Sequence, residues 1–278
     1  MTGIVDAHHH LWRLARGDYG WLTPDLGILH RDYGPADIEA LAAAHGIAAT
    51  ILVQAAPTEA ETRYLLDLAK TSPLIAGVVG WLDFEAADFA DRLADLATAG
   101  PLVGLRPMLQ GLDDDAYVLR PAVLSNLDRL AAAGLAFDVL TFPRHLPHVL
   151  AALAPRPGLR AVVDHLSKPP IAAGTLDPWR ADVAAVAALP NVMCKVSGLV
   201  TEADHASWTP ADLEPFVAHV VRAFGPDRLM WGSDWPVCLL TAPYGRVLDV
   251  TRELLSRHLA AEDLEKVFAT NARRFYGV

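Results

Sequence analysis

The sequence predicts an α/β fold, a single (β/α)8 barrel of the TIM type, and three observations support this prediction. The chain has 278 residues, 53% of them hydrophobic, which is enough to bury one large core. Short apolar runs alternate with helical segments, and the runs start roughly 30 residues apart, as repeated strand–helix units do. Most runs are nearly continuous in apolar residues, which is typical of parallel strands buried on both faces.

Eight of these runs are expected to form the strands of the barrel. In chain order they are Gly3–His8, Thr50–Gln54, Ile75–Trp81, Leu102–Arg106, Ala136–Leu140, Leu159–His165, Val192–Ser197 and Leu229–Asp234. The alternative is an open doubly wound sheet. That fold would need a Gly-rich phosphate-binding loop after a strand, and neither common motif of this kind is present.

Capping residues, prolines and glycines mark the helices between the strands. Thr58 and Glu61 have the spacing of a capping box. Asp83 is expected to cap a helix that Gly100 ends. Two further capping residues precede prolines, and two more glycines are expected to stop helices: Asp177-Pro178, Thr209-Pro210, Gly46 and Gly225.

The chain lacks a Ser/Gly-rich linker, so residues 1–278 are expected to form one domain. Residues 11–33 form an unusually long loop after the first strand, and this loop contains Trp12, Trp21 and Tyr33. In a barrel such a loop would lie over the active site, so we expect it to act as a lid.

Composition restricts the partners and the compartment. The formal charge of −10 argues against nucleic acid or an anionic membrane surface as the main partner. Cys194 and Cys238 are the only cysteines and lie far apart, which fits a reducing compartment. Neither a signal peptide nor an apolar stretch of the ~20 residues that span a bilayer is readable. We therefore expect a cytoplasmic protein, a monomer or small homo-oligomer, that acts on a small molecule.

Polar residues interrupt the apolar strands at one end. The active sites of such barrels form at the carboxyl ends of the strands. In chain order these ends carry His8 and His10, Gln54, Trp81, Arg106, Asp138, His165, Lys195, and Asp234 followed by Trp235. Burying each polar group without a partner would cost several kcal/mol, so one shared polar site explains them together.

Histidines and a carboxylate in this set suggest a metal site. Strand side chains alternate faces, so Asp6, His8 and His10 are expected on one face and His9 on the other. Two imidazoles on one face can chelate a metal ion. With His165, the carboxylate of Asp234 could complete that site, activate water as a general base, or do both in turn.

The remaining strand-end residues have less specific roles. Arg106 and Lys195 suit an oxyanion or substrate hydroxyls, although each is nearly as well explained as the structural partner of a carboxylate. Four residues are expected to contact substrate: Gln54, Trp81, Asp138 and Trp235.

Taken in order, several strand-end motifs resemble those of a known family. They are Val5–Trp12, Gly104–Arg106, Asp164–Pro169, Lys195–Leu199, Gly232–Pro236 and the tail Asn271-Ala272. The set resembles the amidohydrolase superfamily, and within it the amidohydrolase-2 group of lactonases. That group includes L-fuconolactonase-like sugar lactonases and a pyrone-dicarboxylate lactonase.

This resemblance implies a (β/α)8 barrel whose site uses His8, His10, His165 and Asp234, with Asp234 taking the proton from the attacking water. The binuclear branch of the superfamily carries a lysine on the fourth strand and a histidine on the fifth, where this chain has Arg106 and Asp138. The resemblance therefore implies either a single divalent ion, for which zinc is the first choice, or no metal ion.

The function implied is hydrolysis of a small sugar lactone to its hydroxy acid. Two alternatives stay open at this point. One is metal-dependent decarboxylation of an aromatic or unsaturated acid, and the other is a catalytically inactive sugar-binding barrel.

Overall fold

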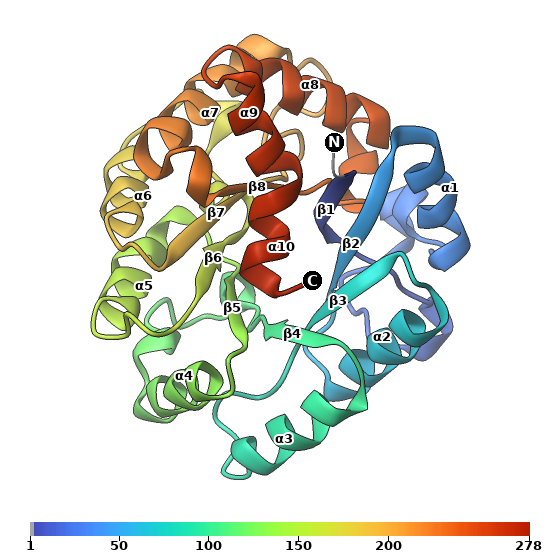
Figure 1. Ribbon diagram of the computed structural model, residues 1–278, viewed down its shortest axis with the longest axis vertical. Coiled ribbons are helices and arrows are strands. Elements are labelled where there is room, and N and C mark those ends of the chain that lie inside the picture. Colours follow the sequence, from blue (N-terminus) through green and yellow to red (C-terminus); the bar gives the residue numbers. More distant parts are fainter. Residues whose placement is uncertain (1–2) are drawn as a thin grey trace.

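Eight parallel strands follow one another around a barrel in the order β1 to β8 (Figure 1). The computed structural model describes residues 3–278. The strands are β1 (Ile4–His9), β2 (Ile47–Val53), β3 (Ile75–Gly80), β4 (Leu102–Leu105), β5 (Ala136–Val139), β6 (Ala161–Val163), β7 (Val192–Val196) and β8 (Leu229–Trp231). A parallel bridge between His9 and Trp235 joins β1 to the segment after β8 and closes the ring. The predicted barrel is confirmed.

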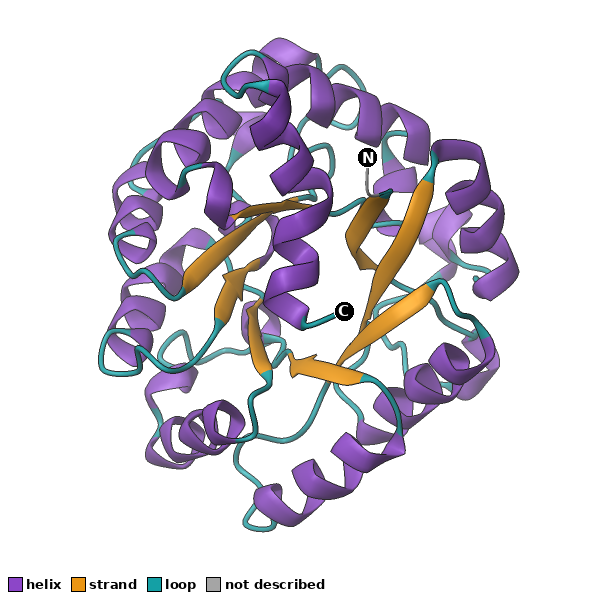
Figure 2. Cartoon of the chain, viewed as in Figure 1, coloured by secondary structure: helices purple, strands orange, loops and turns teal. Residues whose placement is uncertain are grey.

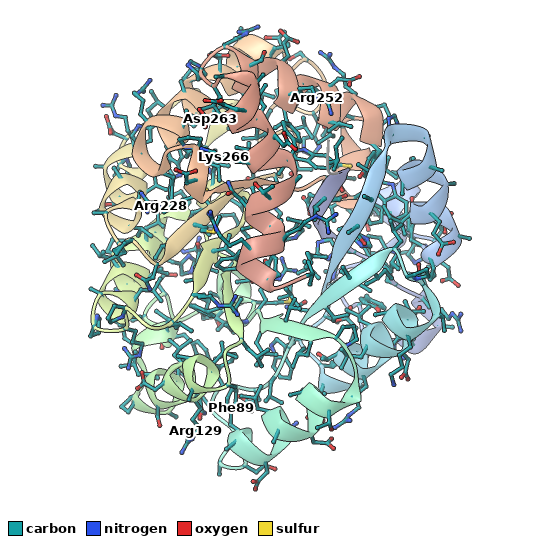
Figure 3. The ribbon with its side chains drawn as sticks, viewed as in Figure 1. Phe89, Arg129, Arg228, Arg252, Asp263 and Lys266 are labelled. Carbon is teal, nitrogen blue, oxygen red and sulfur yellow. The ribbon has the colours of Figure 1, made fainter. Side chains whose placement is uncertain are left out.

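Helices surround the strands on the outside, except for the last one, which lies across the centre of the ring (Figure 2). They are α1 (Pro35–His45), α2 (Glu59–Thr71), α3 (Phe89–Ala99), α4 (Pro121–Ala132), α5 (Leu146–Leu153), α6 (Trp179–Ala187), α7 (Pro210–Phe224), α8 (Tyr244–Ser256), α9 (Ala261–Glu265) and α10 (Asn271–Tyr276). Their outer faces carry charged side chains. Asp263 of α9, for example, pairs with Lys266, which follows that helix and also pairs with Asp227, at 2.9 Å each (Figure 3).

The predicted caps were correct only in part. Thr58 accepts a hydrogen bond from the backbone of Glu61 at the start of α2, but the Glu61 side chain does not return the bond. It accepts instead from the amides of Ala55 and Ala56 after β2. The prediction for Asp83 was wrong, because Asp88 precedes the first residue of α3.

The prediction that Asp177 caps the helix after it was wrong, because α6 begins at Trp179 and Pro178 is its N-cap. The other boundaries agree with the sequence. Thr209 caps α7, and Gly46 and Gly225 end α1 and α7 with φ angles of 71° and 69°. Among residues 3–278, no helix is both long and apolar enough to span a membrane.

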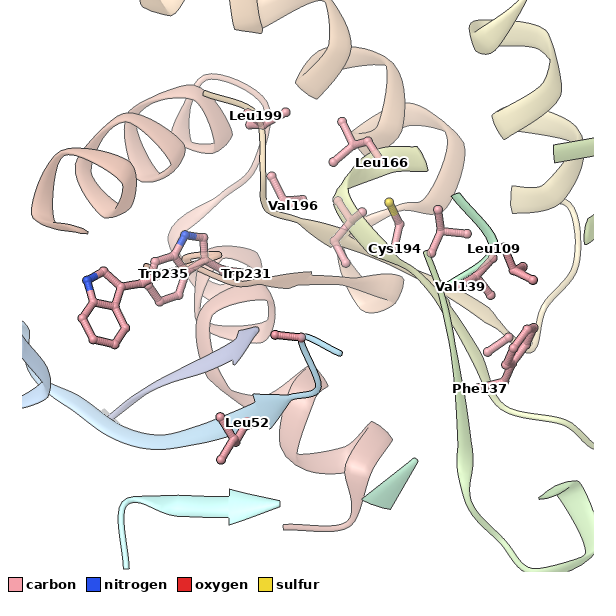
Figure 4. Close-up of a cluster of buried hydrophobic side chains, with 14 of the residues drawn as sticks. Leu52, Leu109, Phe137, Val139, Leu166, Cys194, Val196, Leu199, Trp231 and Trp235 are labelled. Carbon is pink, nitrogen blue, oxygen red and sulfur yellow. The ribbon is translucent and has the colours of Figure 1, made fainter. Parts of the chain in front are cut away.

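Alternation along the strands divides the apolar side chains into two layers. Outward-facing residues such as Phe137, Cys194 and Trp231 pack against the helices (Figure 4). Their inward-facing neighbours Ala136, Met193 and Met230 fill the interior of the barrel. The inward face of a strand therefore leads directly up to the groups at its carboxyl end.

The last helix closes the end of the barrel opposite the carboxyl ends of the strands. In Figure 1, α10 lies across the centre of the ring. Ala272, Phe275 and Tyr276 belong to the interior apolar layer. Asn271 anchors the helix, because its amide donates to the carbonyl oxygens of Pro226 and Leu229, each at 2.7 Å. The chain therefore ends with aromatic side chains pointing into the barrel.

Candidate active site

A cavity of about 390 Å³ opens at the carboxyl ends of the strands. Its walls are formed by His10, Trp21, Ala55, Arg106, Met108, Gln110, Gly111, Leu140, His165, Lys168, Asp234 and Val237. Four buried polar side chains of these walls, which we call the reactive wall, are those of His10, Arg106, His165 and Asp234. Trp21 comes from the long loop 11–33, so that loop contributes one side of the cavity.

His8 of β1 and His10, which follows the end of that strand, converge at the base of the site. The Nε2 atoms of His8 and His10 lie 3.2 Å apart. A register shift in β1 between Asp6 and His9 interrupts the alternation of its side chains. The expectation that Asp6 shares this face was therefore wrong, and its carboxylate accepts from the Tyr244 hydroxyl of α8 at 2.9 Å.

The other expectation for β1 was correct. His9 is buried away from the site, and its Nε2 lies 2.9 Å from the hydroxyl of Thr50.

His165 and Asp234 lie beyond the strands that were expected to include them. β6 ends at Val163 and β8 at Trp231, and His165 and Asp234 take left-handed φ angles of 53° and 58°. Left-handed backbone is costly for residues with side chains and concentrates at functional sites. At both positions the chain leaves the extended path, and the side chain lines the cavity.

Two glycines allow the histidines to pack closely. A Cβ at Gly198, which has a φ of +64°, would lie 2.7 Å from Nδ1 of His165, and a Cβ at Gly232 would lie 2.6 Å from Cβ of His8. Contacts this short do not occur between real side chains, so both positions require glycine.

Each wall histidine is oriented through its second nitrogen. Nδ1 of His10 donates to the carbonyl oxygen of Val53 at 2.8 Å, which leaves Nε2 with its lone pair toward the site. Nδ1 of His165 lies 2.8 Å from the hydroxyl of Ser197. Bonds of this kind fix the ring position of a metal ligand or of a catalytic imidazole.

Asp234 lies among the three imidazoles. Its Oδ1 is 3.4 Å from Nε2 of His10 and 3.8 Å from Nε2 of both His8 and His165. Burial acts to raise the pKa of the Asp234 carboxyl, but the surrounding imidazoles, that of His165 first, outweigh it and hold that pKa below its usual range. Asp234 is therefore ionised at neutral pH and able to accept a proton.

Two of the imidazoles around Asp234, those of His165 and His8, are neutral at pH 7. Burial lowers the pKa of His165 to about 4, although the Asp234 carboxylate opposes the shift. Burial also holds the pKa of His8 well below its usual value. A neutral ring has a lone pair to offer, which is the form that binds a metal.

The donor set fits a single divalent ion. His8, His10 and Asp234 each offer a ligand atom, and these atoms lie within 4.8 Å of one another. Nitrogen and carboxylate ligands together suit zinc, which binds them at roughly 2.0–2.2 Å. Nε2 of His165 lies 3.8 Å from the same oxygen of Asp234, and His165 forms a second group of neighbouring ligand atoms with His8 and Asp164.

Arg106 brings a positive charge to the cavity. Its Nη1 lies 3.1 Å from Oδ2 of Asp164 and 3.3 Å from Nε2 of His8. Its Nη2 donates to the carbonyl oxygen of Gln54, whose side-chain amide in turn donates to the carbonyl of Arg106 at 2.8 Å. Gln54 is thus fully buried as a support for Arg106.

Behind the wall lies a second group of polar residues, which we call the support cluster: Asp138, Asp164, Lys195 and Tyr276. Nζ of Lys195 contacts Oδ2 of Asp138 at 2.5 Å and Oδ1 of Asp164 at 3.0 Å. All three charged side chains are fully buried. The Tyr276 hydroxyl donates to Oδ2 of Asp138 at 2.7 Å.

The two carboxyls of the support cluster titrate differently. Burial acts to raise both pKa values. Burial raises the pKa of Asp138 to about 6, although the positive charge of Lys195 acts to lower it. At Asp164, Lys195 and His8 outweigh burial and hold the pKa well below its usual range.

The structure places several sequence-predicted site residues away from the cavity wall. Lys195 and Asp138 belong to the support cluster. Trp81 lines a neighbouring cavity, together with Trp21 and Met108. Trp235 is only 3% exposed and packs edge-on against Tyr33.

Four residues of the site were missed from the sequence. Asp164 was not singled out because it precedes His165 at the end of an apolar run. Lys168 and Gln110 lie in loops, where lysine and glutamine are ordinary surface residues. Tyr276 gave no signal, since an aromatic residue in a terminal helix normally packs in the core.

The comparisons with known proteins show which family the chain resembles along its whole length. The family model described as amidohydrolase matches residues 5–278. An L-fucono-1,5-lactonase from Burkholderia ambifaria is 43% identical over 282 residues, covering 100% of this chain and 97% of the relative. An L-fucono-1,5-lactonase from Burkholderia multivorans is 38% identical and covers 99% of this chain and 96% of the relative.

A solved structure of this family has the same fold. The crystal structure of an amidohydrolase from Burkholderia multivorans with bound zinc superposes with a TM-score of 0.94 at 39% identity. The match covers 99% of both chains.

Proposed function

The chain belongs to the amidohydrolase family, and on that premise we propose that it hydrolyses a sugar 1,5-lactone of the L-fucono-lactone kind to the open hydroxy acid. The observation that carries the proposal is the ionised Asp234 carboxylate, which faces the cavity among three imidazoles. The full-length identity to two L-fucono-1,5-lactonases supports the choice of substrate.

Asp234 would act as the general base. A water molecule beside Asp234 is deprotonated as it attacks the lactone carbonyl carbon, and the carboxylate receives the proton. The ring C–O bond then breaks, and the low pKa of Asp234 favours return of the proton to the departing ring oxygen. One residue therefore serves both proton transfers.

The negative charge that develops on the carbonyl oxygen needs a positive partner. Arg106 is the cationic side chain of the reactive wall, and its contacts with Asp164 and Gln54 fix it in place before substrate binds. A zinc ion held by His8, His10, His165 and Asp234 would supply Lewis acidity toward the same oxygen.

The remaining walls suit a deoxy-sugar ring, which has both hydroxyl groups and a methyl group. Lys168 and Gln110 provide polar contacts, and Oε1 of Gln110 has no hydrogen-bond partner among the described residues. Other parts of the wall are apolar and include Trp21, Leu140 and Val237. We propose that the hydroxyls face Lys168 and Gln110 and the methyl group faces the apolar side.

The wider setting follows from the same proposal. We propose one catalytic domain with loop 11–33 over the site. We also propose a cytoplasmic enzyme, monomeric or a small homo-oligomer, that binds no nucleic acid. The two free, buried thiols of Cys194 and Cys238 support a reducing compartment.

The test is a panel of sugar lactones assayed with a pH indicator before and after chelation, with zinc content measured on both samples. We expect acid release from L-fucono-1,5-lactone, lower activity after chelation, and recovery on adding Zn²⁺. Aromatic acids tested for CO₂ release serve as the control panel. If the zinc-loaded protein hydrolysed none of the sugar lactones, the proposed function would be wrong.

A further inference from the structure

The C-terminal helix contacts the site from the closed end of the barrel. Tyr276 is the last residue of α10 and is 4% exposed. Its hydroxyl donates to Oδ2 of Asp138 at 2.7 Å, although the two residues are 138 positions apart in the chain. A phenylalanine would fill the same space, so packing alone does not require this hydroxyl.

Asp138 depends on that hydroxyl for its orientation. Both polar contacts of its carboxylate, with Tyr276 and with Lys195, are made by Oδ2. Oδ1 of Asp138 is buried and has no hydrogen-bond partner among residues 3–278. Without Tyr276, a single contact would hold a carboxylate that is free to rotate about its terminal bond.

Lys195 in turn lies next to a metal-binding imidazole. Its Nζ is 2.5 Å from Asp138, 3.0 Å from Oδ1 of Asp164 and 3.2 Å from Nδ1 of His8. Oδ1 of Asp164 lies 3.4 Å from the same Nδ1. Lysine and aspartate therefore both lie within reach of one ring nitrogen of His8.

The choice between them decides where His8 carries its proton. If Nδ1 donates to Asp164, then Nε2 keeps a lone pair directed toward His10 and Asp234. If Nδ1 accepts from Lys195, the proton moves to Nε2 and blocks it as a ligand. The group to which Lys195 donates therefore bears on which nitrogen of His8 carries the proton.

We propose that Tyr276 is a positioning residue of the site: by fixing Asp138, it keeps Lys195 directed at the carboxylates of Asp138 and Asp164, at 2.5 and 3.0 Å, rather than at Nδ1 of His8, at 3.2 Å. Nδ1 of His8 then donates to Asp164, and its Nε2 stays available to the metal. This inference rests on the metal site of the proposed function. It gives the C-terminal helix a role beyond closing the barrel.

The test compares Tyr276→Phe with Phe275→Leu. Phe275 lies next to Tyr276, is 5% exposed and belongs to the same apolar layer, so its variant loses packing without losing a hydroxyl. The dissociation constant for Zn²⁺ is measured on metal-free protein by competition with a chromogenic chelator. Melting temperature is recorded alongside, and kcat and KM are measured on L-fucono-1,5-lactone.

We expect Tyr276→Phe to weaken Zn²⁺ binding about tenfold, the lower end for groups that orient a metal ligand, and to lower kcat with little change in KM. Phe275→Leu should lower the melting temperature and leave Zn²⁺ affinity unchanged. Zn²⁺ affinity does not depend on the substrate, so a failure of the lactone proposal is distinguished from a failure of this one.

Two outcomes would overturn the proposal. One is wild-type Zn²⁺ affinity in Tyr276→Phe, and the other is an equal loss in Phe275→Leu. Asp138→Asn provides a second route, and in the double variant with Tyr276→Phe the Zn²⁺ affinity should be no weaker than in Asp138→Asn alone. Additive losses would mean that Tyr276 does not act through Asp138.

Discussion

The reactive wall and the support cluster are neighbouring groups of buried polar residues, yet they use their polar atoms differently. In the wall, Asp234 and His10 direct atoms toward a cavity of about 390 Å³. In the support cluster, Lys195 and Asp138 are fully buried and contact other protein groups. Burial by itself therefore does not distinguish a reacting residue from one that positions it.

Their carboxylates show how charge decides the outcome. Asp234 and Asp164 have pKa values below the usual range because imidazoles or a lysine outweigh burial. The pKa of Asp138 is raised to about 6 although it contacts the same lysine. The variants below separate the two groups by asking which of them affects turnover, stability or substrate binding.

The largest effect is expected at the reactive wall. Asp234→Asn removes the base while preserving the shape of the side chain, so kcat should fall by about 10²–10⁴-fold. The measurement is lactone hydrolysis at saturating substrate. Circular dichroism and melting temperature should show an intact fold, and the zinc content of the variant separates loss of the base from loss of the ion. Turnover within threefold of wild type would exclude Asp234 as the base.

A substitution in the support cluster should instead lower the stability of the fold. Lys195→Met keeps the length of the side chain but leaves Asp138 and Asp164 facing each other without their cation. Breaking a buried pair in this way costs about 3–5 kcal/mol in the free energy of unfolding. Urea denaturation at pH 7 measures the loss.

Lys70→Met is the matched control for this change, because Lys70 pairs with Asp67 at 2.8 Å on the exposed surface. It should change the free energy of unfolding little. If Lys195→Met were as stable as Lys70→Met, the support cluster would not hold the site together.

How far the sequence could predict these two regions follows from the distances involved. The strand pattern predicted the barrel and brought His8, His10, His165 and Asp234 to one end, because parallel strands align their carboxyl ends. Strand periodicity cannot show where the backbone leaves the strand. It therefore missed the register shift that separates Asp6 from His8 and the left-handed turns at His165 and Asp234.

The support cluster was harder to predict, because its contacts depend on how distant parts of the chain pack. Tyr276 and Asp138 are 138 residues apart, and the local sequence around either residue does not predict their contact. Asp138 and Lys195 were identified as strand-end polar residues. Their direct contact, which places them behind His8, becomes visible only once the barrel is closed.

Glu61 is a third kind of buried carboxyl, which accepts hydrogen bonds from backbone amides. It accepts from Ala55 and Ala56 after β2, and burial raises its pKa from 4.5 to about 7. The folded protein therefore keeps this proton at pH values where the unfolded chain has lost it. As pH rises from 4.5 to 7, Glu61 should lower the free energy of unfolding by up to about 3 kcal/mol.

Glu61→Gln mimics the protonated side chain and should remove that contribution. The measurement is urea denaturation of both proteins at several pH values between 4.5 and 7.5. Other titrating groups are common to both proteins, so the difference between the two curves isolates Glu61. Parallel curves would show that Glu61 is ionised in the fold throughout this range.

The smallest effect is expected at Lys168, on the rim of the cavity. Its Nζ pairs with Glu202 at 3.0 Å, and its side chain lines the cavity beside His165. If Lys168 contacts a substrate hydroxyl, Lys168→Met should raise KM up to about tenfold with little change in kcat, because such a contact is made equally in the ground and transition states.

Glu202→Gln is the matched control, since it removes the same ion pair but keeps the lysine. Steady-state kinetics on L-fucono-1,5-lactone should give a smaller change in KM for this variant than for Lys168→Met. Equal changes would mean that the pair only stabilises the loops that carry it. The rim would then resemble the support cluster, and the specificity for the sugar would have to come from the reactive wall and Gln110.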